Sequence, residues 1–309
     1  MKILLVSKIF YPSKRIGAIR PTNFAKYLAI LGHDITVITE DNSTHTFHPM
    51  EGVNVIRVSH STYMSKLLIR NNNRIQKNKA SASPLYPDIP ATNYNKSNIL
   101  VSFKWTLKRV IAELFYLLIE FDWYFKAKRQ VYCQFDKQTF DITISSYGPL
   151  SSFLLGRFSQ KRNISKYWVC DFRDNMRSAA YPKLVNVIYA FYERLAARNA
   201  NLFLFVSKGQ QFMFHKNNKL TLEAINSIVI YNGYEVKDIR SSLASGESRV
   251  LSFGYTGQLY KNKSDFSLLF DVLEGLIASG EIDQKNIKSN MLVRMIVNLN
   301  VNVANSSVS

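Results

Sequence analysis

The sequence has few cysteines, few acidic residues and no long uncharged apolar run, and each shortage excludes a class of protein. Two cysteines, Cys133 and Cys170, cannot form a disulfide framework and lack metal-site spacing, so we expect two buried thiols in a reducing compartment. The nearest candidate for a membrane-spanning helix, 110–125, contains three acidic residues. The first apolar run is interrupted at Lys8, which favours a strand over a signal peptide.

The charge is strongly one-sided, with 40 Lys and Arg against 22 Asp and Glu and a formal net charge of +18. Residues 62–130 alone contain twelve Lys or Arg and four Asp or Glu. Such a surplus attracts an anionic membrane surface, a phosphorylated small molecule or a nucleic acid, although it also suits a merely solubilising surface. No recognisable RNA- or DNA-binding motif accompanies it, so we expect no nucleic-acid partner.

What the sequence does contain is a regular alternation of short apolar runs with helical segments. Residues 2–7 and 35–39 are continuously apolar, which is typical of parallel strands that are covered on both faces. In the segment between them the apolar residues recur with the spacing of a helix. Further strands are expected at 53–58, nearer a sheet edge, and at 140–144, 167–170, 202–206 and 228–230. We predict an α/β fold, a Rossmann-like doubly wound parallel sheet over 1–240, whose ligands lie beyond the carboxyl ends of the strands.

A long insertion, 62–130, interrupts this alternation. Residues 71–98 are polar and contain three prolines, which predicts a surface loop, and 99–130 predict a long helix. Aromatic residues beside cations in that helix suit a membrane interface, but a helix packed on a sheet looks similar. A second strand–loop–helix starts at 249–288, and the tail 289–309 holds one charged residue. This part is too short for its own core, so we expect only a fragment of a second Rossmann-like domain.

Several short segments, taken in order, resemble the family-4 glycosyltransferases of the two-domain GT-B type, especially bacterial enzymes of capsule and lipopolysaccharide biosynthesis. The matching segments are 2–7 with Gly17-Ala18-Ile19-Arg20, Leu31-Gly32-His33, Asp171-Phe172-Arg173-Asp174, Glu193-Arg194, Val206-Ser207-Lys208, Tyr231-Asn232-Gly233-Tyr234 and Gly254-Tyr255-Thr256-Gly257.

The resemblance implies a transferase that moves a sugar, with retention of configuration, from a nucleotide-diphospho-sugar to a polysaccharide or lipid-phosphate-linked acceptor. The N-terminal domain would bind the acceptor and the C-terminal domain the donor, with no separate cofactor. The sequence has no Asp-x-Asp, the usual metal-binding motif of the other main glycosyltransferase fold, which fits GT-B. The implied location is cytoplasmic, peripheral to the inner face of the membrane.

On the acceptor side the candidate residues are Gly17, Arg20, Tyr147, Asp171, Arg173 and Asp174. Gly17 would permit close approach of a ligand, and Arg20 could bind phosphate in a bidentate manner, with an ordinary loop glycine and a surface arginine as the equal alternative. The two aspartates could orient acceptor hydroxyls, and an internal Asp–Arg ion pair is the equal alternative. Tyr147 stands where related mannosyltransferases have a functional histidine, so no catalytic residue is assigned.

On the donor side the candidates are Lys208, Asn232, Gly257, Lys261 and Lys263, the lysines because fixed cations would stabilise a departing diphosphate. His45 and His48 are expected in a surface loop. Family members continue for well over a hundred residues beyond the position of Gly257, so we expect a truncated donor domain and little or no transfer by this chain alone. The alternative is a non-catalytic protein that binds an acceptor or partner at the membrane surface.

Overall fold

The computed structural model describes residues 1–13, 15–41, 49–77, 99–178, 181–233, 251–257, 266–283 and 287–293. The chain divides into two compact units. The first unit consists of Met1–Arg74 and Ile99–Tyr234, and the second of Ile75–Asn98 and Glu235–Ser309. The predicted histidine loop with His45 and His48 lies outside the described residues.

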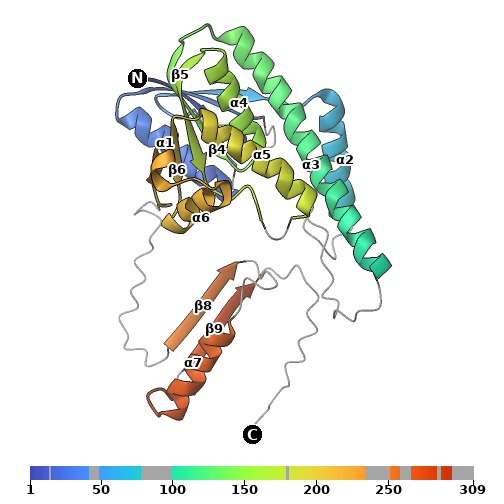
Figure 1. Ribbon diagram of the computed structural model, residues 1–309, viewed down its shortest axis with the longest axis vertical. Helices are drawn as coiled ribbons and strands as arrows, with labels where there is room; N and C mark the ends of the chain where they lie inside the picture. Colours follow the sequence, from blue (N-terminus) through green and yellow to red (C-terminus); the bar gives the residue numbers. More distant parts are fainter. Residues whose placement is uncertain are drawn as a thin grey trace. The chain divides into compact units, whose positions relative to one another are not determined.

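A seven-stranded sheet, parallel throughout, forms the centre of the first unit (Figure 1). Its strands are β1 (Lys2–Val6), β2 (Asp34–Glu40), β3 (Val53–Val58), β4 (Phe140–Tyr147), β5 (Ser165–Phe172), β6 (Leu202–Phe205) and β7 (Ser227–Val229). The strand order is β3-β2-β1-β4-β5-β6-β7, so the order reverses between β1 and β4. This confirms the predicted Rossmann-like fold and the edge position of β3.

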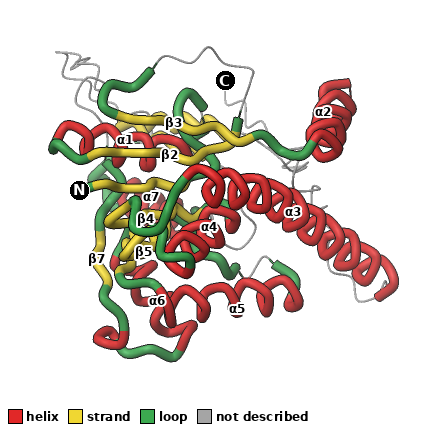
Figure 2. The backbone as a smooth tube through the Cα atoms, turned by 90° about the horizontal axis from the view of Figure 1, so that it is seen from above, coloured by secondary structure: helices red, strands yellow, loops and turns green. Residues whose placement is uncertain are grey.

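Helices connect these strands, and the direction of each crossover decides which face a helix covers. They are α1 (Ile16–Ile30), α2 (Thr62–Lys77), α3 (Ile99–Gln134), α4 (Leu150–Lys161), α5 (Lys183–Asn199) and α6 (Lys208–Asn218), with a 3₁₀ turn at Leu222–Ala224. Crossovers between parallel strands are right-handed. The chain crosses the sheet in one direction from β1 to β2 and in the opposite direction from β4 to β7, so the connecting helices lie on opposite faces. Figure 2 shows α3, α4 and α5 together on one side of the sheet.

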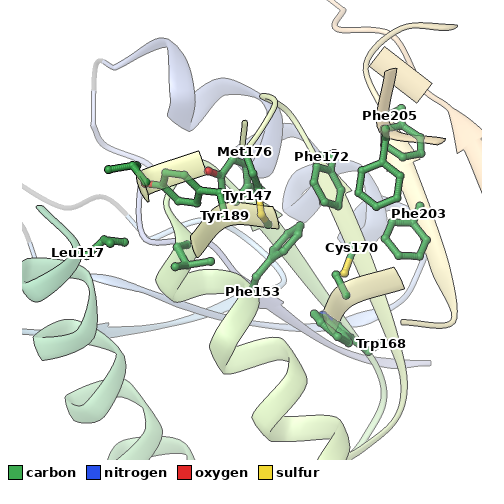
Figure 3. Close-up of a cluster of buried hydrophobic side chains, with 14 residues drawn as sticks. Leu117, Tyr147, Phe153, Trp168, Cys170, Phe172, Met176, Tyr189, Phe203 and Phe205 are labelled. Atoms are coloured by element: carbon green, nitrogen blue, oxygen red, sulfur yellow. The ribbon is translucent and has the colours of Figure 1, made fainter. Parts of the chain in front are cut away.

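Each face of the sheet has its own core, and β5 contributes to both because its side chains alternate. Trp168, Cys170 and Phe172 point into an aromatic cluster under α4, α5 and α6, part of which appears in Figure 3. Val169 points into the other core, which α1 covers. The residue that follows on that face is Asp171, which is therefore directed towards α1.

Two sequence predictions within the first unit need correction. The segment 71–98 was expected to be a loop, but α2 continues through it to Lys77; residues 78–98 lie outside the described part. Asparagine forms helices less readily than alanine, but the difference is only a few tenths of a kcal/mol per residue. The helical hydrogen bonds of that turn outweigh it. Cys133 was expected to be buried, but it is exposed on α3, whereas Cys170 is buried as predicted.

The second unit contains β8 (Leu251–Gly257), α7 (Ser267–Ala278) and β9 (Ile287–Val293). The predicted strand and helix are both present, although the helix begins at Ser267 rather than near Ser264. The sequence analysis missed β9. This strand pairs in parallel with β8, and the pairing begins with Leu251 opposite Ile287. This strand contains Lys288, Ser289 and Asn290, which have low strand propensity. It can therefore be identified as a strand only from its pairing with β8.

Candidate functional site at the carboxyl edge of the sheet

Five of the six acceptor-side residues predicted from the sequence lie where β1 and β5 end, and Tyr147 is the exception. Gly17 and Arg20 lie in the first turns of α1, which follows β1, while Gly148 directly follows β4. Asp171 lies near the end of β5, and Arg173 directly follows it. Parallel strands present their carboxyl ends at one edge, so residues far apart in the sequence meet there.

Arg20 and Asp171 form a buried ion pair. Arg20 Nε donates to Asp171 Oδ1 at 2.9 Å, and Arg20 Nη2 lies 2.9 Å from the same oxygen. The second carboxylate oxygen accepts a hydrogen bond from Ser146 Oγ at 2.8 Å. Both partners are almost fully withdrawn from solvent, so removing either would leave an uncompensated buried charge. The sequence left an internal Asp–Arg ion pair open for Asp171, and Asp171 forms one, but its partner is Arg20 rather than Arg173.

Arg20 also ties the end of β7 to this pair. Its Nη1 donates to the Ile230 carbonyl at 2.8 Å and to Asn232 Oδ1 at 3.3 Å. Asn232, predicted on the donor side, thus lies beside an acceptor-side residue of the same unit. One guanidinium therefore connects α1, β5 and the segment after β7.

Arg173 supplies a hydrogen bond that α1 cannot make by itself. In a helix the Gly17 carbonyl would accept from the N–H of the residue four positions later, but that residue is Pro21, which has no N–H. Arg173 Nη1 donates to the Gly17 carbonyl instead. A Cβ at position 17 would lie only 2.5 Å from Arg173 Nη1, so glycine is required for this approach.

Gly148 holds the other side of the same guanidinium. Arg173 Nη2 donates to the Gly148 carbonyl at 3.0 Å, and Arg173 Nε donates to Asp174 Oδ2 at 3.2 Å. Gly148 has φ of +119°, a conformation that side chains strongly disfavour. Asp174 is mostly exposed, so its carboxylate is the acidic group of this cluster that faces solvent.

Tyr147 lies on the opposite face of β4 from this cluster. It is buried in the aromatic core, with its ring centroid 5.3 Å from that of Phe153 and 5.9 Å from that of Phe172 (Figure 3). Burial, followed by the nearby Tyr189 and other acidic groups, raises the pKa of the Tyr147 hydroxyl well above its ordinary value. The structure does not bring Tyr147 together with Arg20 and Arg173.

The donor-side candidates are spread over both units. Lys208 is exposed at the first position of α6, after Ser207, whose hydroxyl caps the helix by accepting from Gln210 N at 3.1 Å. Gly257 is the last residue of β8 in the second unit. Lys261 and Lys263 lie outside the described residues.

Glu193, from the Glu193-Arg194 segment, has a buried role between helices. Its carboxylate accepts from Arg177 Nε at 2.7 Å and from Asn218 Nδ2 at 3.1 Å. These contacts link α5 to the segment after β5 and to the end of α6. Glu193 thus helps to fix the elements that carry Asp174 and Lys208.

Sequence reasoning missed a buried charged group where the strand order reverses. Lys8 Nζ lies 2.7 Å from Glu120 Oε1, and Glu120 Oε2 accepts from the main-chain N–H of Ser151 at 3.3 Å and from its hydroxyl. Ser151 lies in the first turn of α4, whose N-terminus favours an anion. The carboxylate of Glu120, from α3, therefore occupies a position that attracts negative charge.

A second missed group joins the edge strand to α3. His60 Nδ1 and Asp122 Oδ2 are 2.8 Å apart, and His60 Nε2 and Glu40 Oε1 are also 2.8 Å apart. Burial would raise the pKa of Glu40, but the His60 hydrogen bond and the charges of Lys8, His60 and Arg15 outweigh burial, so the pKa is lowered. Burial likewise opposes a lowered pKa at Asp122, where hydrogen bonds from Ser61 and His60 prevail.

Little in the sequence could have revealed these two groups. Lys8 lies 112 positions before Glu120, and His60 lies 62 positions before Asp122. The acidic residues lie in the long predicted helix, where a charged face in water is the ordinary expectation. The one usable signal was the position of Lys8 directly after the first strand, where ligands and charged partners gather.

Comparison with known proteins gives structural neighbours only. No protein-family model matches the chain, and no curated protein sequence matches it. Among solved structures, it is similar to sucrose-phosphate synthase from Thermosynechococcus elongatus, with 14% identity, 94% of this chain and 70% of that chain covered, and a TM-score of 0.45. It is also similar to HepE from Anabaena, solved in complex with UDP and glucose, with 12% identity, 96% and 70% covered, and a TM-score of 0.44. The N-terminal domain of Candida albicans trehalose-6-phosphate phosphatase has 10% identity, 94% and 64% covered, and a TM-score of 0.47.

Proposed function

We propose that the protein acts in sugar transfer as a GT-B glycosyltransferase, with the carboxyl edge of the first unit receiving the acceptor. One observation carries the proposal. Two of the segments that carry the sequence resemblance, 17–20 and 171–174, are joined by the Arg20–Asp171 pair and by the bond from Arg173 to Gly17. They meet at the edge where open α/β sheets bind ligands.

The proposed reaction moves a sugar, with retention, from a nucleotide-diphospho-sugar to a polysaccharide or lipid-phosphate-linked acceptor. The donor is a substrate, and the proposal includes no separate cofactor. Asp174 accepts a hydrogen bond from an acceptor hydroxyl, because it is the solvent-facing carboxylate of the cluster. Lys208 and the N-terminus of α6 face the developing charge of the leaving diphosphate. Assignment to family 4 and to capsule or lipopolysaccharide assembly rests on the resemblance of the segments alone.

The first test is binding and transfer by the full chain. We expect a nucleotide-diphospho-sugar, supplied at about one hundred times its Kd, to add about 2.7 kcal/mol to the free energy of unfolding, and a lipid-phosphate acceptor to be glycosylated. Differential scanning fluorimetry measures the first effect and release of nucleoside diphosphate the second. No rise in Tm and no release with any common nucleotide-sugar would reject the proposal.

Asp174 allows a sharper test of the acceptor side. Asp174→Asn keeps the size of the side chain and is expected to raise the KM for the acceptor at least tenfold while leaving Tm within about 2 °C of the wild type. Asp136→Asn, on another exposed carboxylate, is the matched control. Equal kinetics for the two variants would remove Asp174 from the site.

A second candidate function is favoured by one specific observation. The two arginines of the cluster are engaged with protein groups, Arg20 with Asp171 and Arg173 with two main-chain carbonyls. Such a cluster stabilises the carboxyl edge of the sheet, but its guanidinium groups are bound to protein groups and do not bind a diphosphate. In the assay above, a non-catalytic protein that binds a glycan acceptor or a partner would neither consume nucleotide-sugars nor be stabilised by them.

A further inference from the structure

Helix α1 is apolar on its outward side as well as on the side that faces the sheet. Phe24, Ala25 and Leu28 pack into the core on the inward side. None of the described helices, α1 included, has the length and hydropathy needed to cross a membrane. The outward side of α1 exposes a row of large apolar side chains, the α1 stripe, which consists of Ile16, Ile19, Tyr27 and Ile30 at 85%, 53%, 49% and 68% exposure. A helix that is apolar on all sides is usually covered on all sides, so the stripe indicates a contact with another molecule.

The α1 stripe is symmetric about Asn23. Ile16 and Ile30 lie seven positions before and after Asn23, and Ile19 and Tyr27 lie four positions before and after it. An antiparallel second copy of α1, centred on Asn23, places Ile16 of each copy against Ile30 of the other and Ile19 against Tyr27. A two-fold interface requires this self-complementarity, because every contact between residues i and j occurs twice. The two Asn23 amides, which have both donors and an acceptor, meet at the two-fold axis and can bond to each other.

The residues of the α1 stripe are uncharged, and so is Asn23. Of the two charged residues in α1, Arg20 is buried in its pair with Asp171. Lys26 lies at the border of the stripe, with its Nζ 5.2 Å from the centre of the Tyr27 ring, so its ammonium group can stay in water when the stripe is covered. Two copies can therefore approach along α1 without bringing like charges into the contact.

The two ends of α1 have opposite charges. Arg15 is exposed directly before the helix, and Asp34 and Glu51 are exposed near its last turn. Glu51 lies there because Gly52 packs against the helix: a Cβ at Gly52 would be 3.3 Å from Ala29 Cβ. In an antiparallel pair the beginning of one helix meets the end of the other, so each Arg15 faces the acidic residues of the other copy. The helix dipoles are opposed as well, which adds to the attraction.

We propose that two copies of this chain associate through α1, with the helices antiparallel and the two-fold axis at Asn23. The stripe is about 21 Å long, and a single helix of this length buries less than the roughly 800 Å² per partner of a stable complex. The dimer is therefore weak, with a Kd in the micromolar range. The carboxyl edge of the sheet lies at the beginning of α1, so the two candidate sites lie at opposite ends of the helix pair. The inference goes beyond the proposed function and does not depend on it.

Sedimentation equilibrium of the full chain tests the association. We expect a reversible equilibrium between monomer and dimer over about 1 μM to about 300 μM, the range that brackets a micromolar Kd. Tyr27→Lys combined with Ile30→Lys should raise the Kd at least tenfold, because four ammonium groups then lie in the contact. Both positions are exposed, so the Tm should stay within about 2 °C of the wild type. A chain that is monomeric over the whole range overturns the proposal.

Helix α5 offers a matched control. Leu184→Lys combined with Val187→Lys adds the same charge at the same spacing, at side chains that are 55% and 66% exposed. This variant should leave the Kd within twofold of the wild type. An equal rise in Kd for the α1 and α5 variants would mean that net charge, and not the α1 stripe, governs the association, and would overturn the proposal.

Cysteine cross-linking tests the register of the two helices. The background is Cys133→Ser, because Cys133 is exposed and Cys170 is buried. In this background a short bismaleimide should join Asn23→Cys to itself. It should join Ile16→Cys to Ile30→Cys in a mixture of the two variants, but not Ile16→Cys to itself, because these positions are about 21 Å apart along an antiparallel pair.

Two outcomes of the cross-linking would contradict the antiparallel pair. Self-linking of Ile16→Cys would indicate parallel helices. Cross-linking of all three variants at the level of the Cys133→Ser background would remove α1 from the contact. Either result overturns the proposal, whereas failure of sugar transfer leaves it unaffected, because neither experiment contains a nucleotide-sugar or an acceptor.

Discussion

At the scale of single residues, the candidate site depends on groups that satisfy one another. Pro21 leaves the Gly17 carbonyl without a helical partner, Arg173 supplies the missing donor, and the absence of a side chain at Gly17 makes room for it. The sequence analysis identified Gly17 and Arg173 as site residues, but it could not pair them. A glycine that admits a ligand and a glycine that admits an arginine have the same sequence pattern.

Substitution of Gly17 by alanine should therefore destabilise the protein. The new Cβ would lie 2.5 Å from Arg173 Nη1 and displace the guanidinium, which costs about 1–3 kcal/mol. Gly209 is a matched control, because it too is the second residue of its helix and a Cβ there meets only Ser207 Oγ, at 3.9 Å. Gly209→Ala should stabilise by up to about 1 kcal/mol. Urea unfolding compares the two, and equal effects would contradict the proposed packing of Arg173.

His60 determines a second, pH-dependent contribution to stability. Removing its ring in His60→Ala breaks the contacts with Glu40 and Asp122 and should cost about 3 kcal/mol at pH 7. Both carboxyls have lowered pKa values in the folded protein, so their stabilising contribution is present above their ordinary values of 4.5 and 3.8. It is lost as the pH falls through the lower folded-state values.

The difference in unfolding free energy between wild type and His60→Ala should consequently shrink as the pH is lowered from about 6 to about 3. Urea titrations at several pH values measure it. His33→Ala, at a half-buried histidine outside this group, should show a small and pH-independent effect over the same range. A wild-type advantage that persists undiminished at pH 3 would exclude the two carboxyls as its source.

At the scale of elements, the first turns of α1 and the end of β5 behave as one unit. Arg173→Ala should cost less when it is combined with Pro21→Ala, because an alanine at position 21 provides a main-chain N–H for the Gly17 carbonyl. We expect a coupling free energy of about 1 kcal/mol in the double-mutant cycle. Thermal and urea unfolding of the two single variants and the double variant measure it. Strict additivity would mean that the Arg173 bond does not replace the helical one.

Element types were predictable from periodicity, whereas the elements that depend on partners were not. The apolar runs of β1, β2 and β5 carry their signal within a few residues, and α3 does so over many turns. By contrast, β9 becomes a strand by pairing with β8, and the last turns of α2 extend through asparagines. In both segments the intrinsic secondary-structure propensity of the residues differs from the structure that their pairing or helical neighbours stabilise.

The same division explains which site residues could be found. Arg20, Asp171 and Asn232 follow or flank strands and could be placed at one edge by topology alone. Tyr147 could be placed at that edge too, but the alternation of β4 directs its side chain into the core. Lys8 and His60 have their partners on α3, and the sequence contains no signal for the distance between those elements.

At the scale of the whole molecule, the net charge of +18 is the dominant electrostatic property. The charges repel one another in the folded state, and this repulsion opposes compactness. The ion pairs Lys8–Glu120 and Arg20–Asp171 are buried, so added salt screens them little, whereas the exposed cations are screened strongly. Salt should therefore act on the repulsion and leave the internal pairs intact.

We expect Tm to rise by about 2–5 °C when NaCl is increased from about 0.05 M to 0.5 M at pH 7, because the Debye length falls well below the spacing of the surface charges. Differential scanning calorimetry measures the shift. The sequence isoelectric point is about 9.8, so the shift should become smaller as the pH is raised towards that value and the net charge declines. A fall in Tm with salt at pH 7 would mean that exposed ion pairs, rather than repulsion between cations, dominate the surface. In that case the excess of lysine and arginine would be balanced locally by acidic partners.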